Sequence, residues 1–288
     1  MKSIGIVANP KKPKAKKSIQ KIILWAKRNK IDCFFSDELK NLISKKEKLL
    51  PLSTLSNESE IMMSLGGDGT MLKTARAVGR GGNPILGINL GSLGFITETT
   101  SKNLDNALRK LLKKEYQIEK RMVLKAKIDK KNQPSMFALN DVVIDKGGVA
   151  RLIQMHLYDG EDFVCSYSAD GLIISTPTGS TAYSLATGGP IINPKTNAII
   201  VAPICPHTLA SRPIIFSENH HLKIVVECDK RDALFTVDGQ IDKKLISGDS
   251  VLVSKARHTV NLIKFPGSSF YSVLRKKLHW GARPSIEE

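Results

Sequence analysis

Residues Ile61–Thr70 read IMMSLGGDGT and join a strand, a turn and a helix within a short span of chain. The run Ile61–Leu65 is apolar apart from one serine, which predicts a short buried strand. A glycine-rich turn follows, and Met71–Val78 then continues in a helical pattern. Sheets of α/β proteins bind ligands outside the carboxyl ends of their strands, next to helix N-termini. We therefore expect a ligand site at this turn.

The turn combines glycines with a single carboxylate. Gly67 and Gly69 flank Asp68 and let backbone N–H groups come close to phosphate oxygens. A tight turn alone would explain the glycines but not the aspartate between them. Lys73 stands in the first helical turn, where a cation opposes the helix dipole, so it is either merely exposed or faces a bound anion. The chain has neither a P-loop nor a G-x-G-x-x-G motif.

Strand and helix patterns alternate through the first 100 residues. Apolar runs at Ile4–Ala8, Ile31–Phe35 and Pro84–Ile88 predict strands, and Lys16–Asn29 places apolar residues at helical spacing. Strand, helix and strand in this order are typical of a parallel sheet with crossover helices. Residues 1–100 are therefore expected to form an α/β domain that carries the glycine turn.

Residues 101–266 change character after a helix expected near Leu104–Lys114. Short runs of strand character and Asp-Gly pairs typical of hairpin turns predict a β-rich domain. The last segment, 267–288, contains an amphipathic stretch, Ser269–Lys277, which we expect to form a helix that packs on the first domain. The expected strands are Met122–Ile128, Phe137–Ile144, Leu152–Tyr158, Phe163–Ser168, Leu172–Ser175, Ala198–Val201, Pro213–Phe216, Leu222–Glu227, Leu234–Val237, Val251–Ser254 and Thr259–Phe265.

The composition is that of a basic globular protein. The chain of 288 residues is 41% hydrophobic and has a formal net charge of +17, which suits anionic partners such as nucleotides. Lysines gather at Lys11–Lys17 without aromatic residues, so this cluster is either a solvated surface or a contact for an anion. The four cysteines form no C-x-x-C pair, which indicates reduced thiols in the cytoplasm and no zinc site. No apolar run is long enough to predict a signal peptide or a membrane span.

Further motifs accompany the glycine turn. Gly66–Thr70 resembles the signature of a kinase superfamily that includes NAD kinases, diacylglycerol and sphingosine kinases, and 6-phosphofructokinases. The later motifs resemble those of the NAD kinases, in the expected order, over nearly the whole chain. Lipid kinases lack this later block, and phosphofructokinases have a second α/β lobe. The motifs are Asp170–Ala186, Gly188–Ile191, Pro203–Leu209, Ser211–Pro213 and Asp238–Gln240.

The resemblance implies ATP-dependent phosphorylation of the adenosine-ribose 2′-hydroxyl of NAD to give NADP, with Asp68 as general base. Mg²⁺ is expected to arrive with ATP rather than in a fixed metal site, and polyphosphate is an alternative donor. A homo-oligomer, either a dimer or a tetramer, is also implied. The implied substrate- and nucleotide-binding positions are Gly67, Gly69, Lys73, Asn140, Asp141, Arg151, Ser168, Asp170, Thr181, Ala182, Tyr183, Ser184, Leu185, Ala186 and Gln240.

Several of these positions have a second interpretation. Asp141 stands where many relatives have glutamate, and Ser168 stands where some carry a basic residue. Asn140 and Asp141 interrupt an apolar run, so they either bind the ligand or form a local turn. The hydroxyl-rich turn that ends at Thr181 either contacts the nucleotide or only caps a short helix. The ring of Tyr183 faces either the ligand or the core.

Two other functions fit parts of the sequence. A lipid kinase of the same superfamily would share the glycine turn and would need an apolar acceptor surface. A basic nucleic-acid-binding protein would explain the net charge and would show steeply salt-dependent binding, but it leaves the glycine turn unexplained. We therefore expect NAD and ATP as partners, with neither nucleic acid nor a membrane.

Overall fold

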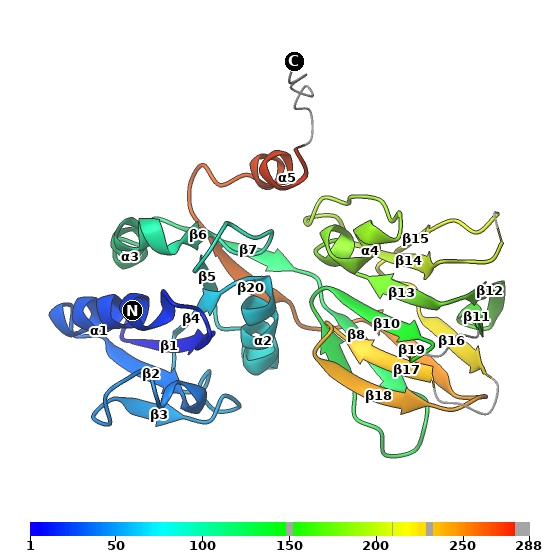
Figure 1. Ribbon diagram of the computed structural model, residues 1–288, viewed down its shortest axis with the longest axis horizontal. Coiled ribbons are helices and arrows are strands. Elements are labelled where there is room, and N and C mark those ends of the chain that lie inside the picture. The colour runs from blue at the N-terminus through cyan, green and yellow to red at the C-terminus, as the bar shows by residue number, and fades with distance from the viewer. Residues whose placement is uncertain (148–151, 209, 229–232, 280–288) are drawn as a thin grey trace. The chain divides into compact units, whose positions relative to one another are not determined.

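The computed structural model describes residues 1–147, 152–208, 210–228 and 233–279. Within it the chain forms two compact units (Figure 1). The first unit contains Met1–Glu119 together with Asn261–Glu288, and the second contains Lys120–Val260. The second unit is therefore an insertion in the sequence of the first.

The first unit is built on one sheet with the strand order β3-β2-β1-β4-β5-β20-β7, and β6 also pairs with β5. Five pairings with known register, from β2–β3 through to β5–β20, are parallel. This confirms the predicted parallel sheet. The strands are β1 (Ser3–Ala8), β2 (Asp32–Ser36), β3 (Lys48–Leu50), β4 (Ile61–Gly66), β5 (Ile85–Asn89), β6 (Thr99–Thr100), β7 (Gln117–Arg121) and β20 (Val260–Lys264).

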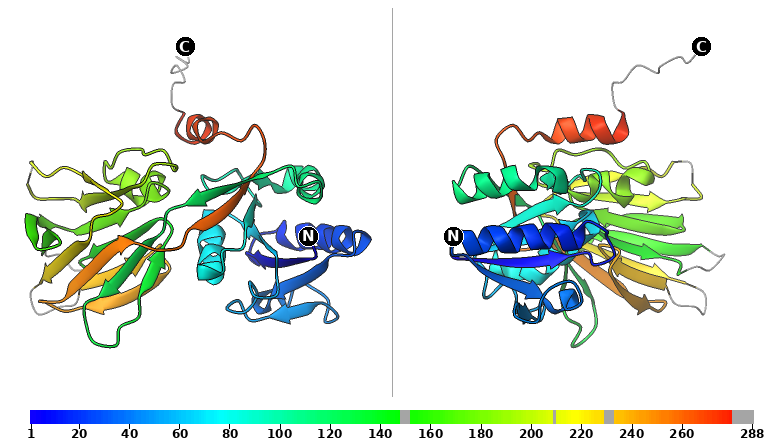
Figure 2. Two further views of the ribbon diagram at one scale, coloured as in Figure 1. Left: turned by 180° about the vertical axis from the view of Figure 1, so that it is seen from behind. Right: turned by 60° about the vertical axis from the view of Figure 1, so that its left-hand side comes forward.

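Helices cover both faces of this sheet. Met63 and Leu65 of β4 share one apolar core with α1 (Ala15–Arg28) and α3 (Leu104–Leu112), which lie side by side (Figure 2). The other face is covered by α2 (Asp68–Val78). The side chain of Met71, in the first turn of α2, lies against the backbone of Gly87 in β5. Because both faces are covered, β4 is buried along its whole length, as expected for a central parallel strand.

The second unit consists of two antiparallel six-stranded sheets, ordered β15-β14-β13-β10-β17-β18 and β12-β11-β16-β19-β8-β9. Alternate residues of both sheets form one large apolar core, which confirms the predicted β-rich domain. Its strands are β8 (Leu124–Ile128), β9 (Met136–Ala138), β10 (Asp141–Asp145), β11 (Ile153–Asp159), β12 (Asp162–Ala169), β13 (Gly171–Ser175), β14 (Ala198–Ile204), β15 (Ile214–Ser217), β16 (Leu222–Glu227), β17 (Ala233–Val237), β18 (Ile241–Leu245) and β19 (Ser250–Lys255).

Two expectations need correction. The stretch Thr259–Phe265 was expected to end the β-rich domain, but its strand β20 joins the first sheet, where Leu262 pairs in parallel with Ile85. The predicted run Phe137–Ile144 is two strands, because β9 and β10 belong to different sheets of the second unit.

The compact units also differ in extent from the expected domains. They divide between residues 119 and 120 and between 260 and 261, whereas the sequence pattern suggested divisions after 100 and 266. Both α3 and β20 thus belong with the first unit. So does the C-terminal helix α5 (Phe270–Leu278), which buries Val273 and Leu274.

Candidate active site

The glycine turn joins β4 to α2 in the first unit. β4 ends at Gly66, Gly67 is the N-cap residue and α2 begins at Asp68. A Cβ atom at Gly66 would lie 2.1 Å from the hydroxyl oxygen of Thr70, so this position requires glycine. Gly69 is exposed, and no atom would lie within 4 Å of a Cβ there. The turn therefore has an open side next to the first N–H groups of the helix.

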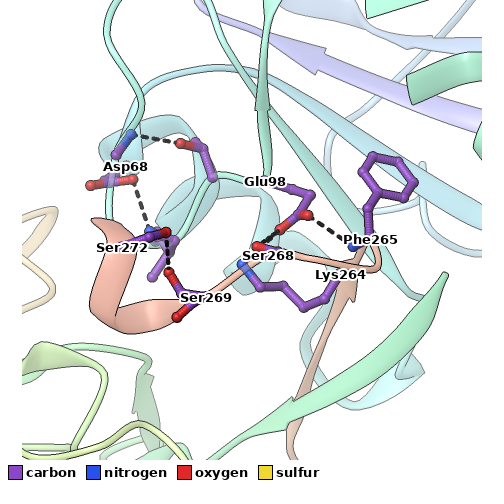
Figure 3. Close-up of polar contacts among 10 residues, drawn as sticks. Asp68, Glu98, Lys264, Phe265, Ser268, Ser269 and Ser272 are labelled. Atoms are coloured by element: carbon purple, nitrogen blue, oxygen red, sulfur yellow. Dashed lines mark hydrogen bonds and ion pairs between the residues drawn. The ribbon is translucent and has the colours of Figure 1, made fainter. Parts of the chain in front are cut away.

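Two backbone donors hold the carboxylate of Asp68. The N–H of Phe95 donates to Oδ2 at 2.9 Å, and the N–H of Ile96 donates to Oδ1 at 3.3 Å. Figure 3 shows the Asp68 carboxylate with one of its hydrogen bonds. Gly94 packs directly against this carboxylate, because a Cβ there would lie 2.1 Å from Oδ1. These two bonds fix the direction of the carboxylate, and the residue as a whole is only partly buried.

The donors belong to a loop that follows β5, which we define as residues 90–98 and call the support loop. Its start is fixed by Asn89, whose Oδ1 accepts the N–H of Gly91 at 2.8 Å. Thr97 fixes its middle, since its hydroxyl accepts the N–H of Gly94 at 2.8 Å. Sequence reasoning missed this loop. The sequence signal that could have identified the loop is Asn89 at the end of a strand, followed by Gly91 and Gly94.

Lys73 has a protein partner in this structure. Its ammonium group forms an ion pair with Glu38, which lies on the short 3-10 helix Asp37–Leu39. The side chains of Lys73 and Glu38 are 30% and 43% exposed, so the pair stands at the surface. Because α2 begins at Asp68, Lys73 lies in the second turn of the helix and not in the first, as the sequence pattern had suggested, and Glu38 offsets its charge there.

The second unit contains a hollow of about 280 Å³. It brings together four of the positions singled out from the sequence: Asn140, Asp141, Ala182 and Tyr183. The ring of Tyr183 is 46% exposed, so it does not face the core. The remaining lining residues are Val143, Asp145, Thr236, Asp238 and Gly239.

Asp238 organises the floor of this hollow. Its carboxylate accepts the backbone N–H groups of Leu139, Asn140 and Asp141, at 3.0, 2.7 and 3.2 Å. Asp238 itself has a φ of +51°, which an Asp-Gly turn tolerates. Its carboxylate thus fixes the crossing from β9 to β10, a role that the turn motif did not reveal.

Burial and charge change the acidity of two lining residues. Asp141 is 5% exposed, and burial together with the negative charge of Asp238 raises its pKa to about 7. Burial raises the pKa of Tyr183 as well, and the nearby Asp145 adds to this. The hollow therefore presents a carboxyl group that holds a proton near neutral pH.

The hydroxyl groups in the run before Tyr183 form hydrogen bonds with the backbone. The hydroxyl of Thr176 donates to the carbonyl of Leu139 at 2.6 Å and accepts the N–H of Gly179 at 3.0 Å. The hydroxyl of Ser175 donates to the carbonyl of Asn140 at 3.2 Å. These bonds hold the segment that carries Asn140. The short helix α4 (Tyr183–Ala186) begins after this run, and Thr181 ends a 3-10 turn.

Other predicted positions lie outside the lining of the hollow. Asp170 accepts an ion-paired hydrogen bond from Lys146 at 2.7 Å. The carbonyl of Ser168 accepts the N–H of His207 at 2.9 Å. Arg151 lies outside the described residues. The other positions outside the lining are Thr181, Ser184, Leu185, Ala186 and Gln240.

A carboxylate held at a glycine-rich turn of a parallel sheet, in a chain that also has a β-rich unit with an acidic hollow, fits a phosphotransferase that acts on an alcohol group. Two family models match: the ATP-NAD kinase N-terminal domain over residues 4–116 and the ATP-NAD kinase C-terminal domain over residues 139–265. The chain belongs to the ATP-NAD kinase family.

Relatives match the chain over almost its full length. The NAD kinase of Syntrophotalea carbinolica is 40% identical over 285 residues, which are 98% of this chain and 100% of that protein. The NAD kinase of Solibacter usitatus is 39% identical over 98% of this chain and 99% of its own. The family is therefore shown by sequence along both units.

Solved structures share the fold. The crystal structure of yeast NADH kinase complexed with NADH has a TM-score of 0.91 at 22% identity, covering 100% of this chain and 90% of its own. The NAD kinase from Archaeoglobus fulgidus in complex with ATP has a TM-score of 0.78 at 23% identity, covering 96% and 98%. At this level of identity the likeness concerns the fold alone.

Proposed function

We propose that this chain transfers the γ-phosphoryl group of ATP to the adenosine-ribose 2′-hydroxyl of NAD, giving NADP and ADP, with Asp68 as general base. Membership of the ATP-NAD kinase family supports the reaction. The observation that carries the role of Asp68 is its carboxylate, which two backbone N–H groups hold at the glycine turn.

The proposed phosphoryl transfer needs one general base. The proton of the 2′-hydroxyl moves to the carboxylate of Asp68 while the oxygen forms a bond to the γ-phosphorus. The bond from the γ-phosphorus to the bridging oxygen breaks, and its electron pair leaves with ADP. Open space beside Gly69 leaves room for the phosphates at the N-terminal end of α2, where the helix dipole favours negative charge. Because the carboxylate of Asp68 is already oriented, less activation free energy is needed to bring it into the reactive geometry.

The hollow of the second unit is proposed to bind NAD. Asn140 offers an amide, Tyr183 offers a partly exposed ring, and Asp141 offers a carboxyl group whose pKa burial and the charge of Asp238 raise to about 7. The protonated form donates a hydrogen bond to a ligand oxygen. The other positions named from the sequence remain in the proposal as substrate contacts on the strength of the family resemblance.

Mg²⁺ belongs to the substrate in this scheme, since it arrives bound to the phosphates of ATP and offsets their charge. Among the described residues, no three His, Cys, Asp or Glu side chains gather as a metal site, and no helix is long and apolar enough to cross a membrane. The homo-oligomer, the cytoplasmic location and the use of polyphosphate stay part of the proposal. Light scattering tests the first, and replacing ATP by polyphosphate in the assay tests the third.

The test is NADP formation by the purified chain with NAD, ATP and Mg²⁺, followed with an NADP-specific dehydrogenase. We expect turnover that needs Mg²⁺ and falls about 10²- to 10⁴-fold in Asp68→Asn, because the asparagine cannot take the proton. Glu60→Gln is the matched control, since Glu60 also accepts a backbone N–H, from Lys2 at 2.9 Å, in the same unit.

The outcomes separate the parts of the proposal. Absence of NADP with either donor would overturn the reaction itself. Robust turnover by a folded Asp68→Asn variant would leave the reaction in place and remove Asp68 as its base. A loss of equal size in Glu60→Gln would assign the effect to general damage of the first unit.

A further inference from the structure

A buried glutamate stands at the end of the support loop. The side chain of Glu98 is 3% exposed, although it carries a carboxylate. Phe265 donates its N–H to Oε1 at 2.8 Å, and the hydroxyl of Ser268 donates to Oε2 at 3.1 Å. Lys264 forms an ion pair with Oε2 at 2.7 Å (Figure 3). Oε1 thus has one neutral donor, and Oε2 has one neutral and one charged donor, which together offset the burial of the charge.

All three partners come from the C-terminal end of the chain. Lys264 is the last residue of β20, and Phe265 and Ser268 belong to the turn that leads into α5. Glu98 therefore joins residues that are more than 160 positions apart in the sequence. The backbone N–H of Glu98 also donates to the carbonyl of Gly87 in β5, at 2.9 Å. The end of the support loop is tied both to the central sheet and to the C-terminal segment.

The same short stretch holds the proposed base. Phe95 and Ile96, whose N–H groups bind the carboxylate of Asp68, lie three and two residues before Glu98. Between them and Glu98, Thr97 accepts the N–H of Gly94 and closes the loop on itself. Few backbone torsions separate the anchored glutamate from the two donors. A shift of Glu98 therefore moves the donors, and the donors set the direction of Asp68.

We propose that Glu98 is a positioning residue for phosphoryl transfer, which acts by fastening the support loop to the C-terminal segment. The inference rests on the proposed function of Asp68. Glu98 does not take part in the chemistry, because its carboxylate is consumed by Phe265, Ser268 and Lys264. Its removal lowers the rate of the chemical step while the substrates still bind.

The test compares Glu98→Gln with the wild-type chain. Glutamine keeps the size of the side chain but removes the negative charge that pairs with Lys264. We expect kcat to fall about ten- to a hundredfold, as for a displacement of catalytic groups on the order of 1 Å, with KM for NAD and ATP within about twofold. Hydrogen–deuterium exchange of peptides that cover residues 90–98 should become faster in the ligand-free variant.

Asp249→Asn is the matched control, in the second unit. Asp249 is also a buried carboxylate, paired with Lys130 at 2.7 Å and bound to the N–H of Ile246 at 3.0 Å. It should lower thermal stability to a similar degree and leave kcat and exchange in residues 90–98 unchanged. Lys264→Met is a second variant, which leaves the Glu98 carboxylate buried with its two neutral donors but without its cation, and we expect kcat to fall in the same direction.

The two proposals fail in different ways. If the wild-type chain forms no NADP, the proposed function is overturned. The hydrogen–deuterium exchange measurement still tests whether Glu98 holds the support loop in place. If the wild-type chain is active and Glu98→Gln keeps its kcat and its slow exchange, the positioning role is overturned. The same holds if kcat falls equally in Asp249→Asn, or if Glu98→Gln raises KM and leaves kcat unchanged.

Discussion

Gly94→Ala tests directly whether the exact direction of the Asp68 carboxylate matters. The added Cβ would lie 2.1 Å from Oδ1, 2.6 Å from Cγ and 2.6 Å from Oδ2 of Asp68. All three nearest atoms belong to this one carboxylate, so the substitution pushes first on the proposed base. Gly94 has no positive φ, so backbone strain does not add to the effect.

The geometry sets the size of the effect. Real Cβ contacts essentially never fall below 3.0 Å, so Oδ1 must retreat by about 1 Å. That movement stretches the bonds from the N–H groups of Phe95 and Ile96, which now stand at 2.9 and 3.3 Å. A misplacement of about 1 Å costs on the order of a hundredfold in rate, or about 2.7 kcal/mol in the activation free energy.

The assay is steady-state NADP formation, with kcat and KM determined separately for NAD and ATP. Gly91→Ala is the matched control in the same loop, because its Cβ would meet only the side chain of Asn89 at an ordinary 3.7 Å. We expect a low kcat in Gly94→Ala and a near-normal one in Gly91→Ala. A folded Gly94→Ala protein with kcat within about twofold of the wild type would refute the reasoning.

Two further predictions concern charge. Burial and Asp238 raise the folded pKa of Asp141 from its ordinary 3.8 to about 7, so the folded chain keeps a proton that the unfolded chain has released. The stability that this proton carries is complete below pH 4 and is lost as the pH rises to about 7. Asp141→Asn should therefore raise the melting temperature at pH 8 and leave it almost unchanged at pH 4, and equal shifts at both values would contradict the raised pKa. The Lys73–Glu38 pair is partly exposed, so Lys73→Met should lower the free energy of unfolding by less than about 1 kcal/mol, measured by urea denaturation. If the cation also contacts the nucleotide, Lys73→Met raises KM for a substrate whereas Glu38→Gln does not, and equal KM values in the two variants would remove Lys73 from the site.

Periodicity predicted most elements of the fold but could not assign every strand to its sheet. The alternating pattern of Val260–Lys264 is that of a strand in either unit, and only the pairing of Leu262 with Ile85 assigns it to the first sheet. Polar strands were missed altogether. β7 and β18 carry lysines, arginine and acidic residues, because both lie at sheet edges, where one side of the strand meets solvent.

The site was predicted where side-chain type carries the chemistry and missed where the backbone does. Asp68 stands out as a carboxylate between two glycines at the end of a strand, and Asn140 and Asp141 stand out because polar groups in an apolar run need partners. The donors to Asp68 are peptide N–H groups of Phe95 and Ile96, whose side chains give no sign of this role. The three N–H groups that Asp238 accepts are equally invisible in the sequence.

The insertion of the second unit into the first has a consequence for biosynthesis. Among the described strands, β7 lies at the end of its sheet next to β20, and β20 separates β7 from β5. About 140 residues of the second unit are translated between these two strands, so the first sheet stays incomplete while they emerge from the ribosome. The second unit, by contrast, has all of its strands between residues 120 and 260. A nascent chain that stalls after Lys255 and before Val260 therefore holds all the described strands of the inserted unit, and an N-terminal unit without the C-terminal residues that anchor Glu98.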